Sequence, residues 1–330
     1  MSTATAALAP LVPPSASGVC VPLHHSGLNY ACRIVGGRPD GTLPASLTAT
    51  TEPLMLLGGA LQDVNSWPRL ERRIADRTPL ILVDLPGTGT ADDLPAEQGF
   101  DTLAETAVHV LDHLRLRRVN LLGASYGAPI AYRIAQRHPE RVARLLLAGT
   151  TRRVAAPMAA LMMDMVRHLE AVATDDTDAP AGSWPGAEEY AARLVAALVN
   201  TGRQDSVRQS QAVRRLLSRQ CLRITRRQAL RNAACHRMLL GGDLLPSGGI
   251  RGVPALVFTG EHDNATTQEE NREVAAAIEG STLVFLREAD HMAHLERDAE
   301  YADLVLRFLH DLPLHDLPYC TRPEHPSPAP

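Results

Sequence analysis

The chain has 330 residues, of which 45% are hydrophobic, and its formal net charge is -4 at pH 7. A chain of this length can bury roughly three quarters of the surface that it exposes when unfolded, which predicts one large domain with an insertion, or two domains. No apolar run approaches the ~20 residues of a transmembrane helix, so the composition excludes a membrane-spanning protein.

The chain begins with a segment, residues 1–17, that is rich in Ala, Ser, Thr and Pro. This segment lacks the basic start and the unbroken apolar stretch of a signal peptide, so we expect a disordered tail. Two β-prone segments follow, at residues 19–23 and 29–35, and Ser26 and Gly27 between them are typical of a turn. This pattern predicts a β-hairpin.

Short apolar runs typical of buried strands then recur along the chain. They cover residues 54–57, 80–83, 119–122, 145–148, 255–258 and 282–285. Helical periodicity lies between them, with apolar residues three and four positions apart over 103–114, and a last helix is predicted over 301–310. Strands that alternate with helices predict an α/β fold, with a mostly parallel, doubly wound sheet that is covered on both faces.

The alternation of strands and helices stops between residues 151 and 249. The pattern there predicts an insertion made of helices, over residues 154–172, 187–200, 206–219 and 225–240. The expected organisation is an α/β core at 18–150 and 250–312, a helical cap at 151–249 and a C-terminal tail at 313–330. We expect the cap to lie over the C-terminal edge of the sheet, where open α/β sheets bind ligands. The Pro-rich end from residue 321 is expected to be disordered.

The pentapeptide Gly-Ala-Ser-Tyr-Gly at residues 123–127 lies between a predicted strand and a helical stretch. In that context Gly-x-Ser-x-Gly is a nucleophile elbow, a tight turn that exposes the serine hydroxyl. The flanking positions must be small, because the strand and the helix nearly collide, and Gly123, Gly127 and Ala128 meet that requirement. The pattern therefore predicts that Ser125 is a nucleophile.

Four further motifs accompany the elbow in a fixed order. They are Leu-Leu-Gly-Gly-Ala at 56–60 with Trp67 beyond it, Asp-Leu-Pro-Gly-Thr-Gly at 84–89, Thr-Gly-Glu-His-Asp at 259–263 and Ala-Asp-His-Met-Ala-His-Leu-Glu at 289–296. In this order they resemble the oxyanion loop, a structural Asp turn, the acid loop and the histidine loop of the α/β-hydrolase superfamily. The resemblance covers about residues 18–312 and implies the α/β-hydrolase fold with a helical cap.

The resemblance also implies a role for each residue of a catalytic triad. Ser125 is the expected nucleophile, His291 is the base that takes and returns its proton, and Asp263 is the carboxylate that orients the imidazole. His294 is an alternative base and Glu261 an alternative acid, but the family pattern favours His291 and Asp263.

Family analogy places the N–H donors of the oxyanion hole on Tyr126 and Ala60. Many relatives have His-Gly where this chain has two glycines, Gly58 and Gly59. The missing imidazole removes a group that would support this loop, and Gly59 is therefore a second candidate donor.

The predicted cap has two features that bear on substrates and partners. Met158, Met162 and Met165 could form an adaptable apolar pocket wall, although plain helix packing would explain them equally well. Between residues 203 and 237, ten arginines accompany one acid, Asp205; they are Arg203, Arg208, Arg214, Arg215, Arg219, Arg223, Arg226, Arg227, Arg231 and Arg237. A solvated helix face is the ordinary explanation, and docking of an acidic acyl carrier protein is the alternative.

The overall composition of the chain weakens a functional interpretation of these arginines. All 33 cationic residues of the chain are Arg, which is typical of a high-GC bacterial genome. Nucleic acid is not expected as a partner, because the net charge is negative and no stacking aromatics accompany the arginines. The five cysteines are scattered and odd in number, which indicates a reducing, cytoplasmic location.

The expected function is that of a serine hydrolase, which cleaves an ester, lactone or thioester of a mainly apolar acyl substrate through an acyl-enzyme intermediate. Two alternatives stay open: a thioesterase or cyclase that releases a polyketide chain from an acyl carrier protein, and a non-catalytic binder of small molecules on the same scaffold. No cofactor is expected, because the glycine pattern of a dinucleotide site is missing. No metal is expected either, since the adjacent His24 and His25 lack further ligands at a suitable spacing.

Overall fold

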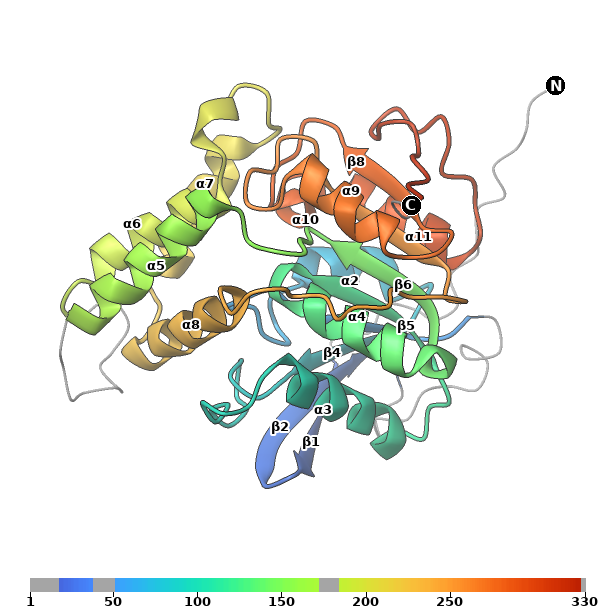
Figure 1. The fold of residues 1–330 in the computed structure, drawn as a ribbon, viewed down its shortest axis with the longest axis horizontal. Helices are drawn as coiled ribbons and strands as arrows, with labels where there is room; N and C mark the ends of the chain where they lie inside the picture. Colours follow the sequence, from blue (N-terminus) through green and yellow to red (C-terminus); the bar gives the residue numbers. More distant parts are fainter. Residues whose placement is uncertain (1–17, 38–50, 172–183, 328–330) are drawn as a thin grey trace.

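The computed structural model describes residues 18–37, 51–171 and 184–327, so the tail predicted at residues 1–17 lies outside the described residues. Its centre is an eight-stranded sheet in the order β1-β2-β4-β3-β5-β6-β7-β8 (Figure 1). The strands are β1 (Val19–His25), β2 (Leu28–Val35), β3 (Leu54–Leu57), β4 (Leu80–Asp84), β5 (Val119–Ala124), β6 (Val142–Ala148), β7 (Ala255–Gly260) and β8 (Thr282–Leu286). The pairs β1–β2 and β2–β4 are antiparallel and the other pairs are parallel, which confirms the mostly parallel sheet.

The hairpin at the start of the chain closes at the predicted turn. Ser26 and Gly27 have φ values of 51° and 81°, the left-handed backbone that tight hairpin turns need. His24 and His25 lie beyond the predicted segment 19–23 and end β1. The His25 ring stacks on that of His109, with 4.4 Å between the ring centroids.

Helices cover both faces of the sheet. Around the core they are α2 (Pro68–Ile74), α3 (Phe100–His113), α4 (Ala128–Arg137), α9 (Gln268–Ala276), α10 (Ala293–Glu296) and α11 (Asp298–Leu309), with short turns η1 (Ser125–Gly127) and η2 (Pro139–Arg141). None of the helices in the described part of the chain combines the length and the apolar character that crossing a bilayer requires.

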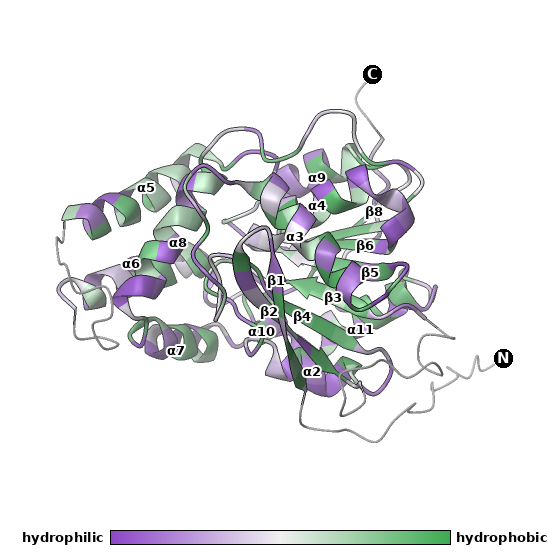
Figure 2. Ribbon diagram, turned by 90° about the horizontal axis from the view of Figure 1, so that it is seen from below, coloured by the Kyte–Doolittle hydropathy of each residue, from purple (hydrophilic) through white to green (hydrophobic). Residues whose placement is uncertain are grey.

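The central strands are buried on both faces, which explains their unbroken apolar runs. In β3, Leu54 and Leu56 join the cluster that contains residues of α2 and α11, whereas Met55 and Leu57 join the cluster that contains residues of α3, α4 and α9. Because successive side chains of a strand point to opposite faces, one apolar run supplies both clusters. Figure 2 shows the central strands mostly in the hydrophobic colour, while the helices around them carry both colours.

A group of helices stands beside the sheet and forms the cap (Figure 1). In the described part of the insertion they are α5 (Ala156–Ala171), α6 (Ala187–Leu198), η3 (Thr201–Arg203), α7 (Ser210–Cys221) and α8 (Arg226–Leu239), close to the helices predicted from the sequence. The cap has an apolar cluster of its own, in which the Trp184 and Tyr190 rings lie 5.8 Å apart. Met292 of the histidine loop belongs to the same cluster, so the cap packs on the core beside that loop.

The C-terminal segment differs from the prediction. The disorder expected from residue 321 is wrong for residues 321–327, because this segment is bound along the edge strand β8. Glu324 forms a β-bridge with Leu283 and an ion pair with Arg272 of α9 at 2.8 Å, and Phe285 donates its N–H to Thr321 Oγ1 at 3.0 Å. An edge strand offers unpaired backbone groups, and a Pro-rich sequence does not reveal that such a partner is near.

Candidate active site

Strand β5 ends in a sharp turn that carries Ser125. This residue has a φ of 49°, in a backbone region that residues other than glycine rarely occupy, and the chain passes from it directly through η1 into α4. Strain of this kind persists only where the surrounding structure enforces it, and it is common at functional sites. The local geometry is that of the predicted elbow.

The glycines on either side of Ser125 are required by close backbone contacts. A Cβ on Gly127 would lie 2.1 Å from the carbonyl oxygen of Leu57, and a Cβ on Gly123 would lie 2.5 Å from that of Gly127. Both separations are far below van der Waals contact. The small residues predicted around the nucleophile are therefore needed because strand and helix meet there.

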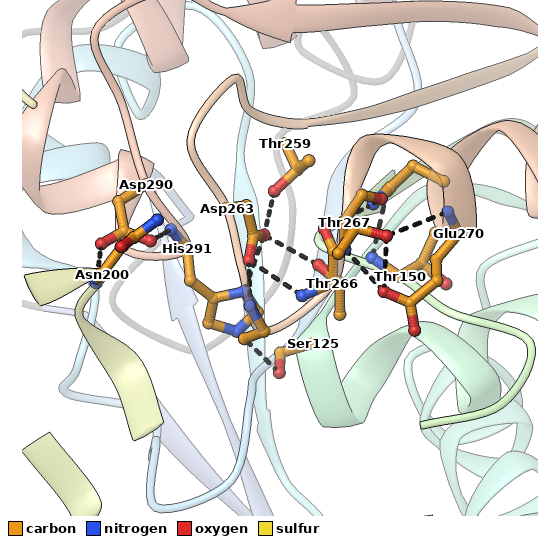
Figure 3. A network of polar contacts seen from close by, with 12 residues as sticks. Ser125, Thr150, Asn200, Thr259, Asp263, Thr266, Thr267, Glu270, Asp290 and His291 are labelled. Carbon is orange, nitrogen blue, oxygen red and sulfur yellow. Dashed lines mark hydrogen bonds and ion pairs between the residues drawn. The ribbon is translucent and has the colours of Figure 1, made fainter. Parts of the chain in front are cut away.

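Three side chains from separate loops meet at this turn (Figure 3). Nε2 of His291 lies 3.1 Å from Oγ of Ser125, and Nδ1 of the same ring lies 2.9 Å from Oδ2 of Asp263. The three residues follow β5, β7 and β8, whose parallel course brings them to the same edge of the sheet. The structure therefore brings together the three residues favoured from the sequence, in the order that a nucleophile, a base and an orienting carboxylate require.

The Asp263 carboxylate is buried and surrounded by donors. It accepts the backbone N–H groups of Ala265 at 2.8 Å and Thr266 at 2.9 Å, the hydroxyl of Thr266 at 2.8 Å and the hydroxyl of Thr259. Burial alone would raise the pKa of Asp263, but the charge and hydrogen bond of His291, together with these donors, lower it. The carboxylate is therefore held ionised and in a fixed orientation.

The two histidines of the histidine loop have opposite electrostatic environments. Burial alone would lower the pKa of His291, but the Asp263 carboxylate outweighs burial and raises it. Burial foremost, and then the charge of His291, lower the pKa of His294 to about 3. A general base needs a pKa near the working pH, so the structure favours His291 for that role. The rival acid, Glu261, contacts the ring of His262 at 3.2 Å.

A side chain that the sequence analysis did not single out, Gln62, supports the oxyanion loop. Its Oε1 accepts the N–H of Gly59 at 2.6 Å, and its Nε2 lies 3.2 Å from Nε2 of His294. The His294 ring in turn packs on Trp67, with 4.7 Å between the ring centroids. Because the N–H of Gly59 already has a partner, the structure favours Ala60 over Gly59 as the donor in this loop.

Gln62 also explains how the loop tolerates two glycines. A Cβ on Gly58 would lie 3.0 Å from Cβ of Gln62 and 3.6 Å from Nε1 of Trp67. These two side chains therefore occupy the space beside the glycine at which many relatives have His. Gln62, which is in contact with His294, supports the loop at this position. A sequence pattern would not reveal this, because the pair is 232 positions apart.

The cap is joined to the catalytic loops through Asn200, which follows α6 (Figure 3). Its backbone N–H donates to Asp290, and its Nδ2 donates to the carbonyl of His262 at 2.8 Å. Asp290 in turn accepts the N–H of His291 at 2.6 Å and donates its own N–H to Glu296 at 2.7 Å. Asn200 therefore contacts the neighbours of both Asp263 and His291, a link that the sequence analysis did not find.

The turn at Asp84 is structural, in agreement with the sequence analysis. Asp84 is 1% exposed, and its carboxylate accepts the N–H groups of Val64 at 2.8 Å and Thr90 at 3.0 Å. A Cβ on Gly89 would lie 2.0 Å from that carboxylate. The residue therefore holds two loops together, and it is not part of the triad.

Ser125 and His291 open into a cavity of about 120 Å³ between the core and the cap. Apolar side chains dominate its lining, which includes Met158 and Met162, and none of its described lining residues is Arg, Asp or Glu. Met165 is not among them: its side chain is fully buried in the apolar cluster of the cap. The prediction for Met165 is therefore corrected, because helix packing accounts for it.

The ten arginines of the cap do not form one continuous surface. Arg226 is only 4% exposed, lies over the Trp184 ring and donates to the carbonyl of Leu169 at 2.9 Å. Ion pairs with carboxylates are made by Arg208, Arg227, Arg231 and Arg237. Within the described residues, no ion pair involves the exposed Arg203, Arg214, Arg215, Arg219 or Arg223.

The sequence and the structure of this chain are similar to those of known proteins. A family model described as alpha/beta hydrolase fold matches residues 52–298. The chain is 35% identical over 95 residues to the dihydrolipoyllysine-residue acetyltransferase component of the acetoin cleaving system of Pseudomonas putida, which is 29% of this chain and 26% of that protein. It is 35% identical over 102 residues to 2-hydroxymuconate semialdehyde hydrolase of Pseudomonas sp. (strain CF600), 30% of this chain and 36% of that protein.

The matched segments thus span only 26% and 36% of the length of these two curated relatives. A structural likeness extends much further along the chain. The crystal structure of the enol-lactonase from Burkholderia xenovorans LB400 matches with a TM-score of 0.69 and 21% identity, over 88% of this chain and 99% of that chain. At that identity the likeness establishes a shared fold.

Proposed function

The chain belongs to the alpha/beta hydrolase fold family, and from that premise we propose that it is a serine hydrolase that cleaves an ester, lactone or thioester with a mainly apolar, uncharged acyl group. The observation that carries the proposal is the hydrogen-bonded chain from Ser125 through His291 to Asp263 on the wall of an apolar cavity. The relatives named hydrolase and enol-lactonase support the same class of reaction.

The geometry supports a two-step mechanism. His291 takes the proton of Ser125 while Oγ attacks the carbonyl carbon, and Asp263 stabilises the imidazolium that forms. The N–H groups of Tyr126 and Ala60 donate hydrogen bonds to the carbonyl oxygen and so stabilise the negative charge that develops on it. His291 then protonates the leaving group, and an acyl-enzyme on Ser125 remains. Water, activated by the same imidazole, releases the acid and restores the serine.

The polarity of the cavity supports the substrate class. A cavity without described arginine side chains offers a substrate carboxylate no arginine counter-charge, and burial of an unpaired charge is costly. Methionines such as Met158 and Met162 adapt to apolar chains of different shape. An uncharged acyl chain therefore fits this lining better than a dicarboxylic acid does.

A fluorophosphonate probe tests this proposal. We expect one adduct, on the peptide that contains Ser125, together with hydrolysis of p-nitrophenyl butyrate. Ser125→Ala should abolish both, whereas Ser206→Ala, an exchange of the same kind in the cap, should change neither. Labelling that persists in Ser125→Ala would refute the assignment. A protein that takes up no probe and hydrolyses no ester would instead be a non-catalytic binder.

A second candidate function is a thioesterase or cyclase that acts on an acyl chain bound to an acyl carrier protein. One observation favours it: Arg214, Arg215 and Arg219 are exposed on α7 and form no ion pair within the described residues. An acidic carrier that docks there would be attracted over a range of roughly 8 Å at physiological ionic strength.

Salt dependence separates this candidate from a plain esterase. The kcat/KM for a carrier-bound thioester should fall steeply with added salt, and that for a small thioester should not. Arg214→Glu with Arg215→Glu should weaken turnover of the carrier-bound substrate alone. Arg118→Glu with Arg144→Glu, which makes the same charge change at two arginines that pair with Glu52 and Asp311, is the control. Equal salt responses for both substrates would remove the carrier hypothesis.

A further inference from the structure

Helix α8 contributes two polar side chains to the cavity. Asn232 and His236 are four residues apart, so they lie one turn apart on the same helix face. Both line the cavity that contains Ser125, and Leu239 continues that face into the cavity. We call Asn232 and His236 the α8 polar pair.

The α8 polar pair is buried and incompletely bonded. Asn232 is 1% exposed and His236 is 4% exposed. The hydroxyl of Tyr190 donates to Oδ1 of Asn232 at 2.6 Å, which leaves the NH₂ group to serve as a donor. In the described part of the protein, neither Nδ2 of Asn232 nor Nδ1 of His236 has a hydrogen-bond partner. A buried polar group without a partner costs roughly 1–3 kcal/mol, and helix packing alone gives no reason for two of them on a cavity wall.

We infer that the α8 polar pair is a substrate subsite, which binds an uncharged oxygen group, a hydroxyl or a carbonyl, on the part of the substrate remote from the bond that is cleaved. Nδ2 of Asn232 would donate to this oxygen. The imidazole of His236 would accept the proton of a hydroxyl, or donate to a carbonyl in its other tautomer. This inference rests on the proposed function and adds a polar requirement to its apolar substrate class.

The charge of the subsite distinguishes this group from a carboxylate. Burial lowers the pKa of His236 to about 4, so its ring is neutral near pH 7. The lining contains no described arginine, and the Asn232 amide is also neutral. A carboxylate would therefore be buried without a counter-charge, whereas an uncharged oxygen would restore the missing hydrogen bonds at no such cost.

Matched esters of increasing chain length test the inference. Each chain ends in a methyl, hydroxyl, ketone or carboxylate group, in one series on the acyl part (p-nitrophenyl esters) and in a second series on the alcohol part (alkyl butyrates). We expect one chain length at which the hydroxyl or ketone ester has a kcat/KM about tenfold above that of the methyl ester, with the carboxylate ester below both. A preference for the methyl ester at every length in both series would overturn the inference.

Variants of the α8 polar pair test whether these two residues cause that preference. Asn232→Leu and His236→Leu remove the polar atoms at similar size, and the tenfold ratio should fall to about one. His236→Gln keeps a donor and an acceptor and should retain part of the ratio. Met158→Leu changes the cavity wall without removing a polar atom, so it should affect both esters alike. A ratio that survives in both Leu variants would refute the α8 polar pair as the subsite.

A binding measurement distinguishes failure of the subsite from failure of the proposed function. In Ser125→Ala, an alkane-1,ω-diol should raise the Tm more than the 1-alkanol of equal length, although the diol is less apolar. Adding Asn232→Leu should remove that difference. Equal stabilisation by both ligands would refute the subsite even in an active esterase. Stabilisation by the diol in a protein that hydrolyses no ester would refute the proposed function and leave the subsite standing.

Discussion

The core and the cap contribute residues to the cavity wall in different ways. In the core, the residues at the site are constrained by close contacts: Gly127 lies against Leu57, and Asp263 is surrounded by donors on neighbouring backbone. The cap contributes side chains on helices, among them Met158 and Asn232. We therefore expect changes in the core to affect the chemical step and changes in the cap to affect substrate selection.

The largest expected effect is on the base in the core. His291→Ala should lower kcat on p-nitrophenyl butyrate by a factor on the order of 10⁴ or more, because the serine then has no proton acceptor. Asp263→Asn should also be severe, since it favours the wrong imidazole tautomer. His294→Ala should cost far less, and His168→Ala in the cap is the control. If His294→Ala proves more damaging than His291→Ala, the two roles must be exchanged.

The second effect contrasts two glycines. Gly127→Ala should destabilise the protein by about 4 kcal/mol or more, or prevent folding, because the new Cβ would overlap the carbonyl of Leu57 and backbone must move. Gly202→Ala in the cap should change stability by less than about 1 kcal/mol, since its Cβ would be 3.4 Å from Oδ1 of Asn200, an ordinary contact. Urea unfolding measures both. Equal stabilities would contradict the close contact in the core.

The third effect concerns pH. Burial foremost, and then the nearby Asp290, raise the pKa of Glu296 to about 8 from an ordinary 4.5. The stability that its protonated form contributes is complete below about pH 4.5 and is lost as the pH rises through about 8, a change on the order of a few kcal/mol. Urea unfolding between pH 5 and 9 should show this loss, and Glu296→Gln should reduce it. Glu170→Gln, at an exposed ion pair of the cap, should leave the pH profile unchanged.

A smaller effect is expected at Gln62. Gln62→Ala removes the acceptor for the Gly59 N–H, so the oxyanion loop is less well positioned and kcat should fall about tenfold, with little change in KM. Gln211→Ala, at an exposed Gln of α7 in the cap, is the control. A rise in KM at constant kcat would show that Gln62 acts on substrate binding instead.

The smallest effect lies in the cap. Met158→Ala enlarges the cavity, so the preference among p-nitrophenyl esters should move to longer acyl chains by a few-fold in kcat/KM. The rate of fluorophosphonate labelling at Ser125 should change less, because the triad is untouched. Met163→Ala, at an exposed methionine of the same helix, should have no effect on either. A change in labelling as large as the change in selectivity would remove the division between core and cap.

Local patterns were sufficient to predict much of this molecule. Six of the eight strands follow from apolar runs, and the other two follow from β-prone segments on either side of a turn. The Ser125 turn follows from its small neighbours, and the order of motifs favoured the residues that meet at the site. What could not be predicted depends on side chains that meet across long stretches of chain. Gln62 and His294 are 232 positions apart, and Asn200 and Asp290 are 90 apart. Periodicity likewise places Arg226 and Met165 on helices, but burial depends on which face the neighbouring helices cover.

The hydrogen bonds of Asn200 connect the position of α6 to the catalytic loops. A movement of α6 away from the core would break its bonds to Asp290 and to the carbonyl of His262, which lie in the loops that carry the base and the acid. Such a movement would thus loosen the two loops that prepare Ser125 for attack. The position of α6 is therefore coupled through one residue, Asn200, to the loops of both His291 and Asp263, so a displacement of this part of the cap would act on the two loops together.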